Sequence, residues 1–215
     1  MDTTEILDLL NQYSESNFNS SWFDDIPNCG HATGAFKECL IFPDMDFVLK
    51  VPFEFRKNSE MGNACYDEIK TYQSAKEAGV EKIFLETWFI GYLANGRPVY
   101  GQAKADYTVS SLPKSKIKKY ECITRTVTEN MRSRVARGMH DHRANCLWID
   151  MLIVLYGKKF AMKFEKWTKE VQLADFHRDN IGYRKDKPII LDYNCCRSFP
   201  SGNFLVRRST SNHTY

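Results

Sequence analysis

The spacing of apolar residues changes near position 105, and this change constrains the fold more than any other feature of the chain. Before it, apolar residues alternate or run in short blocks between turn residues, which is typical of β-strands. After it, from 116 to 137, they recur at steps of three and four residues, which is typical of an amphipathic helix. We therefore predict an α+β chain with a strand-rich first part (residues 1–104) and a helical second part (residues 105–215), with a seam near 103–106.

The first part has the sequence pattern of several strands. Residues 34–42 and 46–53 are apolar or alternating runs joined by a turn-rich link. Residues 83–105 predict two strands around Asn95-Gly96, which is a strong hairpin signal. We expect these strands to form the body of the first part.

Helical spacing also occurs at residues 59–79 and 144–171. In the first of these regions Gly79 stands where a helix should end, and the residues that can share its apolar face are Ala64, Ile69, Tyr72 and Ala75. The second region predicts one broken helix or two successive helices, followed by a short strand at 187–194. Its expected core residues are Trp148, Leu152, Leu155, Phe160, Phe164, Trp167 and Val171.

Composition excludes several classes of protein. With 215 residues, 43% of them hydrophobic, the chain can bury a core without covalent staples, and its net charge of only +3 gives no reason to expect a nucleic-acid or membrane partner. No two of the seven cysteines have C-x-x-C spacing, which favours a reducing, cytoplasmic location over a disulfide framework or a zinc site. Residues 1–16 are acidic and amphipathic, so we expect no signal peptide. The longest apolar run, 146–156, is about half the length that spans a bilayer and contains Asp150.

Two segments are locally basic, at 113–119 and 132–143. We interpret them as solvated helix faces, with docking of an acidic partner or nucleic acid as the alternative. His140 and His142 lie in the second segment, where a polar loop is favoured over a metal site because alternating side chains point apart and no third ligand is evident.

Three polar residues near the C-terminus have a spacing that suits phosphate chemistry. Asp175 precedes Asn180 by five positions, and Asp192 follows Asn180 by twelve, at the end of the apolar run 189–191. One carboxylate can orient an attacking hydroxyl, while an amide oxygen and a second carboxylate can hold Mg²⁺ on phosphates. The alternative is an ordinary solvated loop, because the pattern is short.

The first part contains residues that would complement this set. Gly30 and Gly34 bracket His31-Ala32-Thr33, which we interpret as a turn of small residues whose backbone amides could approach phosphates, or as an ordinary hairpin turn. Lys50 lies inside an apolar strand and precedes Glu68 by 18 positions, as a phosphate-binding lysine and its ion-pair partner would. A lysine that points to solvent is the alternative.

These stretches together resemble a known family. "CGHATGAF", "VLKV", "ADFHRDNIG" and "ILDYN" occur in the order and spacing seen in the small serine/threonine protein kinases of short-tailed, T7-like bacteriophages, and the resemblance covers residues 25–200. It implies a bilobal protein-kinase-like fold with a reduced C-lobe, in which residues 1–104 form the N-lobe and 105–215 the C-lobe.

The resemblance also implies a site for ATP and Mg²⁺. The nucleotide would contact Gly30, His31, Thr33 and Gly34 over the phosphates, Lys50 at the α and β phosphates, and Gln102, Ala103 and Lys104 at the adenine. Asp175 would be the catalytic base, Glu68 the partner of Lys50, and Asn180 and Asp192 the Mg²⁺ ligands. The His177-Arg178-Asp179 triplet would then be a misleading match inside the loop.

The function implied is an ATP- and Mg²⁺-dependent serine/threonine protein kinase, encoded by a phage and acting on host proteins, including transcription machinery, in the host cytoplasm. The chain departs from larger kinases in having Leu173-Ala174 where they have His-Arg, which suggests constitutive competence, and in having Asn194 where they have a flexible glycine. One alternative is a pseudokinase that binds and inhibits a host factor. Another is a small-molecule phosphotransferase, which Leu173 disfavours because the related loop has histidine there.

Overall fold

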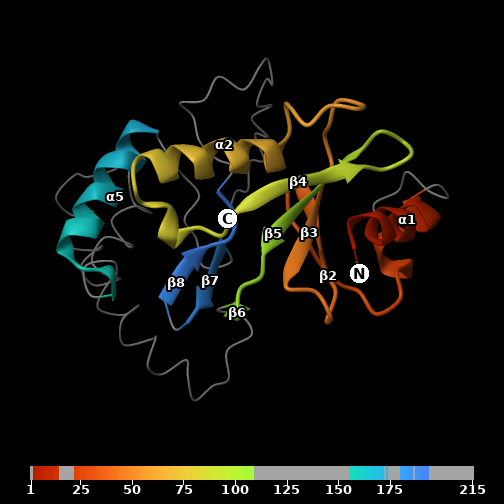
Figure 1. Cartoon of the computed structure of the whole chain (residues 1–215), viewed down its shortest axis with the longest axis horizontal. Coiled ribbons are helices and arrows are strands. Elements are labelled where there is room, and N and C mark those ends of the chain that lie inside the picture. Colours follow the sequence, from red (N-terminus) through yellow and green to blue (C-terminus); the bar gives the residue numbers. More distant parts are fainter. Residues whose placement is uncertain are drawn as a thin grey trace, which may run out of the picture.

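The computed structural model (Figure 1) describes residues 2–14, 22–108, 155–171, 173, 180–185 and 187–193. Within them the chain is an α+β protein with a five-stranded sheet, a three-stranded sheet and helices against both, which confirms the predicted class. The predicted helix at 116–137, the core residues Trp148 and Leu152, and the catalytic candidate Asp175 lie outside the described residues.

The larger sheet is antiparallel, with strand order β1-β2-β3-β5-β4. Its strands are β1 (Gly30–Thr33), β2 (Lys37–Ile41), β3 (Phe47–Pro52), β4 (Thr87–Tyr92) and β5 (Pro98–Ala103). They confirm the two predicted runs and the predicted hairpin, whose turn contains Gly96 at a φ of 81°.

One prediction is wrong: His31, Ala32 and Thr33 form strand β1 and pair with β2, so that only Gly34 lies in the turn. All four β1 residues are exposed, so the strand carries no apolar alternation that the sequence could reveal.

One face of this sheet is covered by the N-terminal segment. Helix α1 (Thr3–Ser14) and the short 3₁₀ helix η1 (Trp22–Asp25) pack there. Asp2 accepts the N–H groups of Thr4 and Glu5 at 2.8 and 2.9 Å, and so caps the first turn of α1. The hydrophobic cluster on this face includes Ile6, Leu10, Trp22, Phe23, Leu40, Leu49, Val51 and Val99.

Helix α2 (Ala64–Glu77) carries one of the predicted site residues and ends before Gly79, whose φ is 63°, as predicted. Its buried residues are Cys65, Glu68, Thr71 and Ala75. The predicted apolar face is therefore correct at Ala75, while Ala64, Ile69 and Tyr72 are only partly buried. The buried face includes a glutamate because Glu68 meets two lysines, which apolar periodicity does not register.

The start of α2 is fixed by Asn63, and we expect Asn63→Ala to lower the free energy of unfolding by about 2 kcal/mol. The side-chain oxygen accepts the N–H groups of Cys65 and Tyr66, both at 3.0 Å, and the amide nitrogen donates to Glu60 O and Tyr100 Oη at 2.8 and 2.9 Å. Urea unfolding should show a smaller loss for Asn63→Asp, which keeps the acceptor. Equal stability of wild type and Asn63→Ala would contradict this role.

The smaller sheet has the order β6-β7-β8 and consists of β6 (Tyr107–Thr108), β7 (Ile181–Arg184) and β8 (Lys187–Ile190). Helix α5 (Lys158–Glu170) begins after Gly157, whose φ of 90° interrupts the helical run, as the prediction of a broken helix requires. Of its predicted core residues, Phe160, Phe164, Trp167 and Val171 are buried and Leu155 is partly buried.

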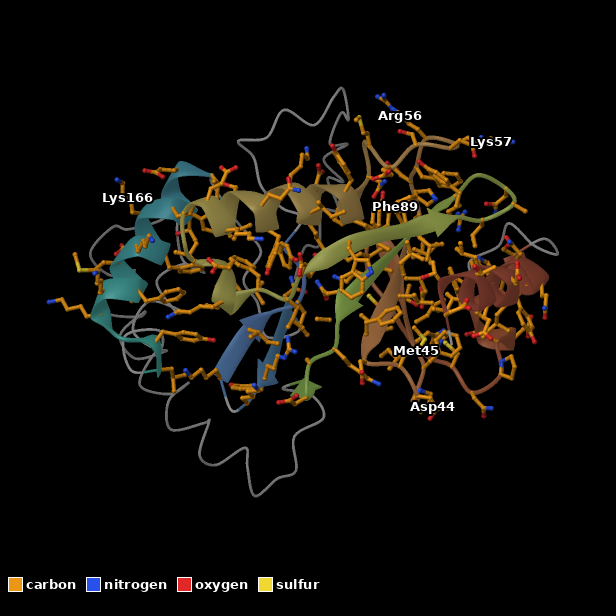
Figure 2. The ribbon with its side chains drawn as sticks, viewed as in Figure 1. Asp44, Met45, Arg56, Lys57, Phe89 and Lys166 are labelled. Carbon is orange, nitrogen blue, oxygen red and sulfur yellow. The ribbon has the colours of Figure 1, made fainter. Side chains whose placement is uncertain are left out.

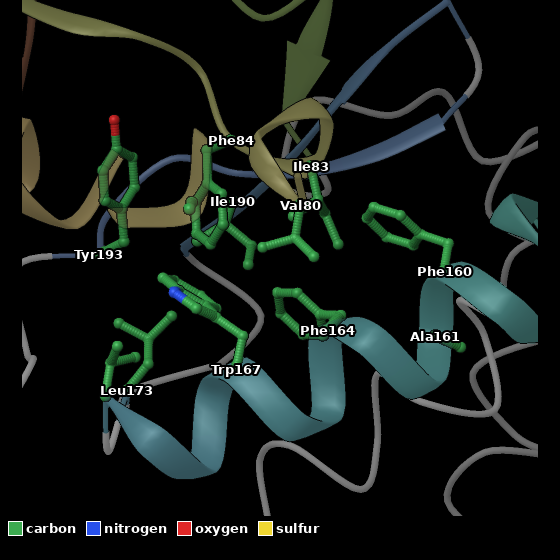
Figure 3. Close-up of a cluster of buried hydrophobic side chains, with 12 residues drawn as sticks. Val80, Ile83, Phe84, Phe160, Ala161, Phe164, Trp167, Leu173, Ile190 and Tyr193 are labelled. Atoms are coloured by element: carbon green, nitrogen blue, oxygen red, sulfur yellow. The ribbon is translucent and has the colours of Figure 1, made fainter. Parts of the chain in front are cut away.

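A second hydrophobic cluster joins α5 to the rest of the molecule (Figure 3). Phe160, Phe164 and Trp167 project from α5 toward Val80, Ile83 and Phe84, which lie in and beside the 3₁₀ helix η2 (Glu81–Ile83). Ala75 of α2, Ile190 at the end of β8 and Tyr193 complete the contact. Residues 75–84 therefore share a core with the second part of the chain, although they precede position 104.

Within the part of the chain that the structure describes, none of the helices has the length and hydrophobicity of a membrane span.

Candidate active site

Strand β3 and helix α2 bring Lys50 and Glu68 together. Lys50 Nζ lies 2.9 and 2.8 Å from the two carboxylate oxygens, and donates to the carbonyl of Leu191 at 2.9 Å. The Lys50 and Glu68 side chains are 3% and 0% exposed. The Lys50 side chain therefore points into the protein interior. Its bond to Leu191, the residue after β8, connects strand β3 to the smaller sheet.

A second lysine, Lys37 at the start of β2, joins the same cluster. Its Nζ lies 2.6 Å from Glu68 Oε1 and 2.8 Å from Asp192 Oδ1, and its side chain is 3% exposed. In the β2–β3 register Cys39 faces Lys50, so Lys37, two residues earlier, lies on the same face of the sheet. Lys37 is not among the predicted site residues, because this register is not visible in the sequence of either strand alone.

Charge in the cluster is balanced, with the ammonium groups of Lys37 and Lys50 against the carboxylates of Glu68 and Asp192. Burial by itself lowers the pKa of Lys37, but the carboxylates of Glu68 and Asp192 outweigh it and hold that pKa well above its ordinary value. Lys37 is therefore a cation at neutral pH.

A shell of buried hydrogen bonds holds these charges in place. Thr87 Oγ1 donates to Glu68 Oε2 at 2.9 Å, and Gln102 Nε2 lies 3.0 Å from both Thr87 Oγ1 and the Leu191 carbonyl. The Tyr193 hydroxyl donates to the carbonyl of Leu85 and lies 3.1 Å from Thr87 Oγ1. Burial, followed by the charge of Glu68, raises the pKa of Tyr193 well above its ordinary value, so this hydroxyl keeps its proton.

The three residues predicted to contact adenine make hydrogen bonds within the chain. The side chain of Gln102 belongs to the charge cluster. The N–H groups of Ala103 and Lys104 donate to Glu86 O and Asp46 O at 3.2 and 3.1 Å. These groups are therefore engaged within the chain, and their contact with adenine stays a prediction.

Asn180 and Asp192 come close through the smaller sheet. Asn180 is buried, and its carbonyl accepts the N–H of Leu191, the residue before Asp192, at 2.9 Å. The Asp192 side chain is 29% exposed, so the cluster reaches solvent at this carboxylate. Mg²⁺ in phosphate sites is bound by one or two carboxylates together with phosphates and water, so one aspartate beside one asparagine fits a metal that arrives with a nucleotide.

The predicted glycine turn divides into two parts. Gly34 N donates to Lys37 O at 2.9 Å, which ties the turn to the cluster. The side chains of His31 and Thr33 lie on the other face of the sheet, where Thr33 Oγ1 donates to Glu38 Oε1 at 3.0 Å and His31 Nε2 is 3.3 Å from Asp24 Oδ1. Burial raises the pKa of Glu38, against the opposing effects of Thr33 and His31. The side chains of His31 and Thr33 are therefore directed away from Lys50.

The structure thus brings Lys50, Glu68, Gln102 and Asp192 into one cluster, with Asn180 adjacent. Among the described residues, no group of three or more His, Cys, Asp and Glu side chains is arranged to hold a metal by itself. Comparison of the chain with protein-family models, with curated proteins and with solved structures finds no match. Its function has to be argued from this cluster.

Proposed function

We propose that the protein is an ATP- and Mg²⁺-dependent protein kinase that phosphorylates serine or threonine. The observation that carries the proposal is the ion-pair cluster in which Lys50 of a strand meets Glu68 of a helix, and Lys37 joins Glu68 to the part-exposed Asp192, which follows the second sheet. In protein kinases a lysine on the third strand pairs with a glutamate on the following helix, and a metal-binding aspartate lies nearby.

The cost of burying charge supports a functional reading of the cluster. Desolvating ions costs several kcal/mol each, and well-packed apolar residues in their place are often as stable or more stable. Lys37, Lys50 and Glu68 are almost fully buried, while Asp192 meets solvent. Such an arrangement suits a polyanionic ligand and its metal at the exposed carboxylate better than it suits stabilisation alone.

Each residue would have a distinct task in this reaction. The lysines would attract the phosphates and Glu68 would hold the lysines in place, while Asn180 and Asp192 would bind Mg²⁺, which neutralises charge on the phosphate oxygens. Asp175, outside the described residues, would orient the attacking hydroxyl. The resemblance to kinases of T7-like phages supplies the proposed substrates, which are proteins of a bacterial host in its cytoplasm.

The proposal includes two lobes, residues 1–104 and 105–215, with the cluster between the two sheets. The hydrophobic cluster on the α1 side of the larger sheet lies wholly within residues 1–104, which supports this division. Residues 75–84 pack with the second cluster, so in this arrangement the end of α2 would fasten one lobe to the other.

A second candidate is a pseudokinase that binds and inhibits a host factor. The observation that favours it is the 2.8 Å ion pair between Lys37 and Asp192, because this ammonium already occupies one oxygen of the expected metal ligand. Metal-dependent ATP binding and phosphate transfer separate the two candidates.

We expect ATP binding to require Mg²⁺ and to weaken at least about tenfold in Asp192→Ala, because the metal loses its carboxylate ligand. Isothermal titration calorimetry with and without Mg²⁺ measures both effects. Asp44→Ala, which removes an exposed carboxylate at the surface (Figure 2), is the matched control and should bind like wild type. Equal affinity in the presence and absence of Mg²⁺ would count against the site.

A further inference from the structure

The two lysines of the cluster differ in the number of hydrogen-bond donors they have left. An ammonium group has three N–H donors. Lys50 has three acceptors within 2.9 Å, which are both oxygens of Glu68 and the carbonyl of Leu191. All its donors are therefore assigned, and a phosphate could reach Lys50 only by displacing one of these bonds.

Lys37 has acceptors for two of its three donors within the part of the chain that the structure describes. These are Glu68 Oε1 at 2.6 Å and Asp192 Oδ1 at 2.8 Å. It is also the lysine in contact with Asp192, the member of the cluster that reaches solvent. Lys37 thus combines an available donor with a direct contact to the one carboxylate of the cluster that reaches solvent.

We propose that Lys37 is the lysine that binds the nucleotide phosphates, and that Lys50 is a positioning residue that holds Glu68. This assignment rests on the proposed function and reverses the role that the family resemblance implies for Lys50. The turn at Gly34 supports the assignment. Its residues are exposed, and the hydrogen bond from Gly34 N to Lys37 O places Lys37 directly beside this turn.

The pair of Lys37 and Asp192 has a second consequence in this scheme. In the free protein the ammonium neutralises the carboxylate that Mg²⁺ must reach. With Mg²⁺ and nucleotide bound, Asp192 would serve as the ligand of the metal, and Lys37 would exchange its contact with Asp192 for one with a phosphate oxygen. Lys37 would then still face an anion, because a phosphate oxygen would replace the carboxylate of Asp192.

Calorimetry with Mg·ATP and thermal unfolding together test the assignment in Lys37→Met, Lys50→Met and the control Lys166→Met. Lys166 is 80% exposed on the outer side of α5 (Figure 2), so the control removes one cation and leaves the cluster intact. We expect Lys37→Met to lose at least about tenfold in affinity. Lys50→Met should lose less affinity but melt lower than Lys37→Met, because Lys50 makes three hydrogen bonds within the cluster and Lys37 makes two.

The opposite order, with Lys50→Met losing more affinity, overturns the assignment, and so does an equal loss in both. Absence of Mg·ATP binding to wild type defeats the proposed function itself, and the assignment with it, which is a different result from a wrong order among the variants.

Nuclear magnetic resonance of the lysine ammonium groups keeps the assignment testable if Lys37→Met does not fold. Lys37→Arg and Lys50→Arg preserve the charges and identify the two signals by their loss. On addition of Mg·ADP to wild type, the Lys37 signal should shift and the Lys50 signal should not. A shift of Lys50 alone, of both, or of neither overturns the assignment.

Discussion

Asp175→Asn is expected to slow phosphate transfer by a factor of about 10² to 10⁴ while ATP still binds. The substitution keeps the shape of the side chain and removes the charge and the proton acceptor that would orient the substrate hydroxyl. Single-turnover phosphorylation of an accepted protein measures the rate, calorimetry measures ATP binding, and thermal unfolding verifies that the variant folds.

Asp179→Asn is the matched control for this experiment, since it makes the same change four residues further along the chain. It should cost much less, because in the proposed register Asp179 only adjoins the metal ligand Asn180. If Asp179→Asn abolished transfer and Asp175→Asn spared it, the register would be wrong and Asn180 would lose its role as well. Wild type that binds ATP and a host factor but transfers no phosphate would favour the pseudokinase.

Glu68→Ala is expected to lower the free energy of unfolding by about 3–5 kcal/mol and the melting temperature by about 10 °C or more. The substitution leaves Lys50 with no carboxylate partner among the described residues, and leaves Lys37 with Asp192 alone. Uncompensated buried cations carry a large desolvation cost. Mg·ATP binding should fall as well, since both lysines lose the residue that positions them.

Glu77→Ala, an exposed position on the same helix, controls for helix propensity and should melt close to wild type. Glu68→Gln keeps the shape and one acceptor oxygen, so its melting temperature should lie between those of wild type and Glu68→Ala. A melting temperature for Glu68→Ala within a few degrees of the Glu77→Ala control would show that the cluster contributes little to folding.

Tyr193, the residue after Asp192, is anchored in the protein interior. Tyr193 is almost fully buried, packs edge to face on Phe84 and donates its hydroxyl to Leu85 O. In the proposed kinase these contacts of Tyr193 would help to keep the neighbouring Asp192 in place, and constitutive competence stays a prediction.

Much of the fold follows from local sequence. The hairpin at Asn95-Gly96 and the end of α2 at Gly79 are set by glycines at positive φ, and the aromatic spacing of α5 defines its buried side. These features depend on backbone preferences and on residues within one or two turns of each other. Such information is present in any short window of the chain. The helices and strands predicted within the described residues were accordingly found, whereas the predicted turn at 31–33 is part of strand β1.

The composition of the site was decided by tertiary structure. Lys37 joins Glu68 and Asp192, 31 and 155 positions away, because the β2–β3 register turns it to the same face as Lys50. The same pleat directs His31 and Thr33 to the opposite face. A shift of one residue in strand pairing would reverse every one of these directions, and pairing is fixed by the packing of whole sheets rather than by any single strand. The sequence could therefore indicate Lys50, Glu68 and Asp192 by their order, whereas the second lysine and the hydrogen-bonded shell around it required the assembled fold.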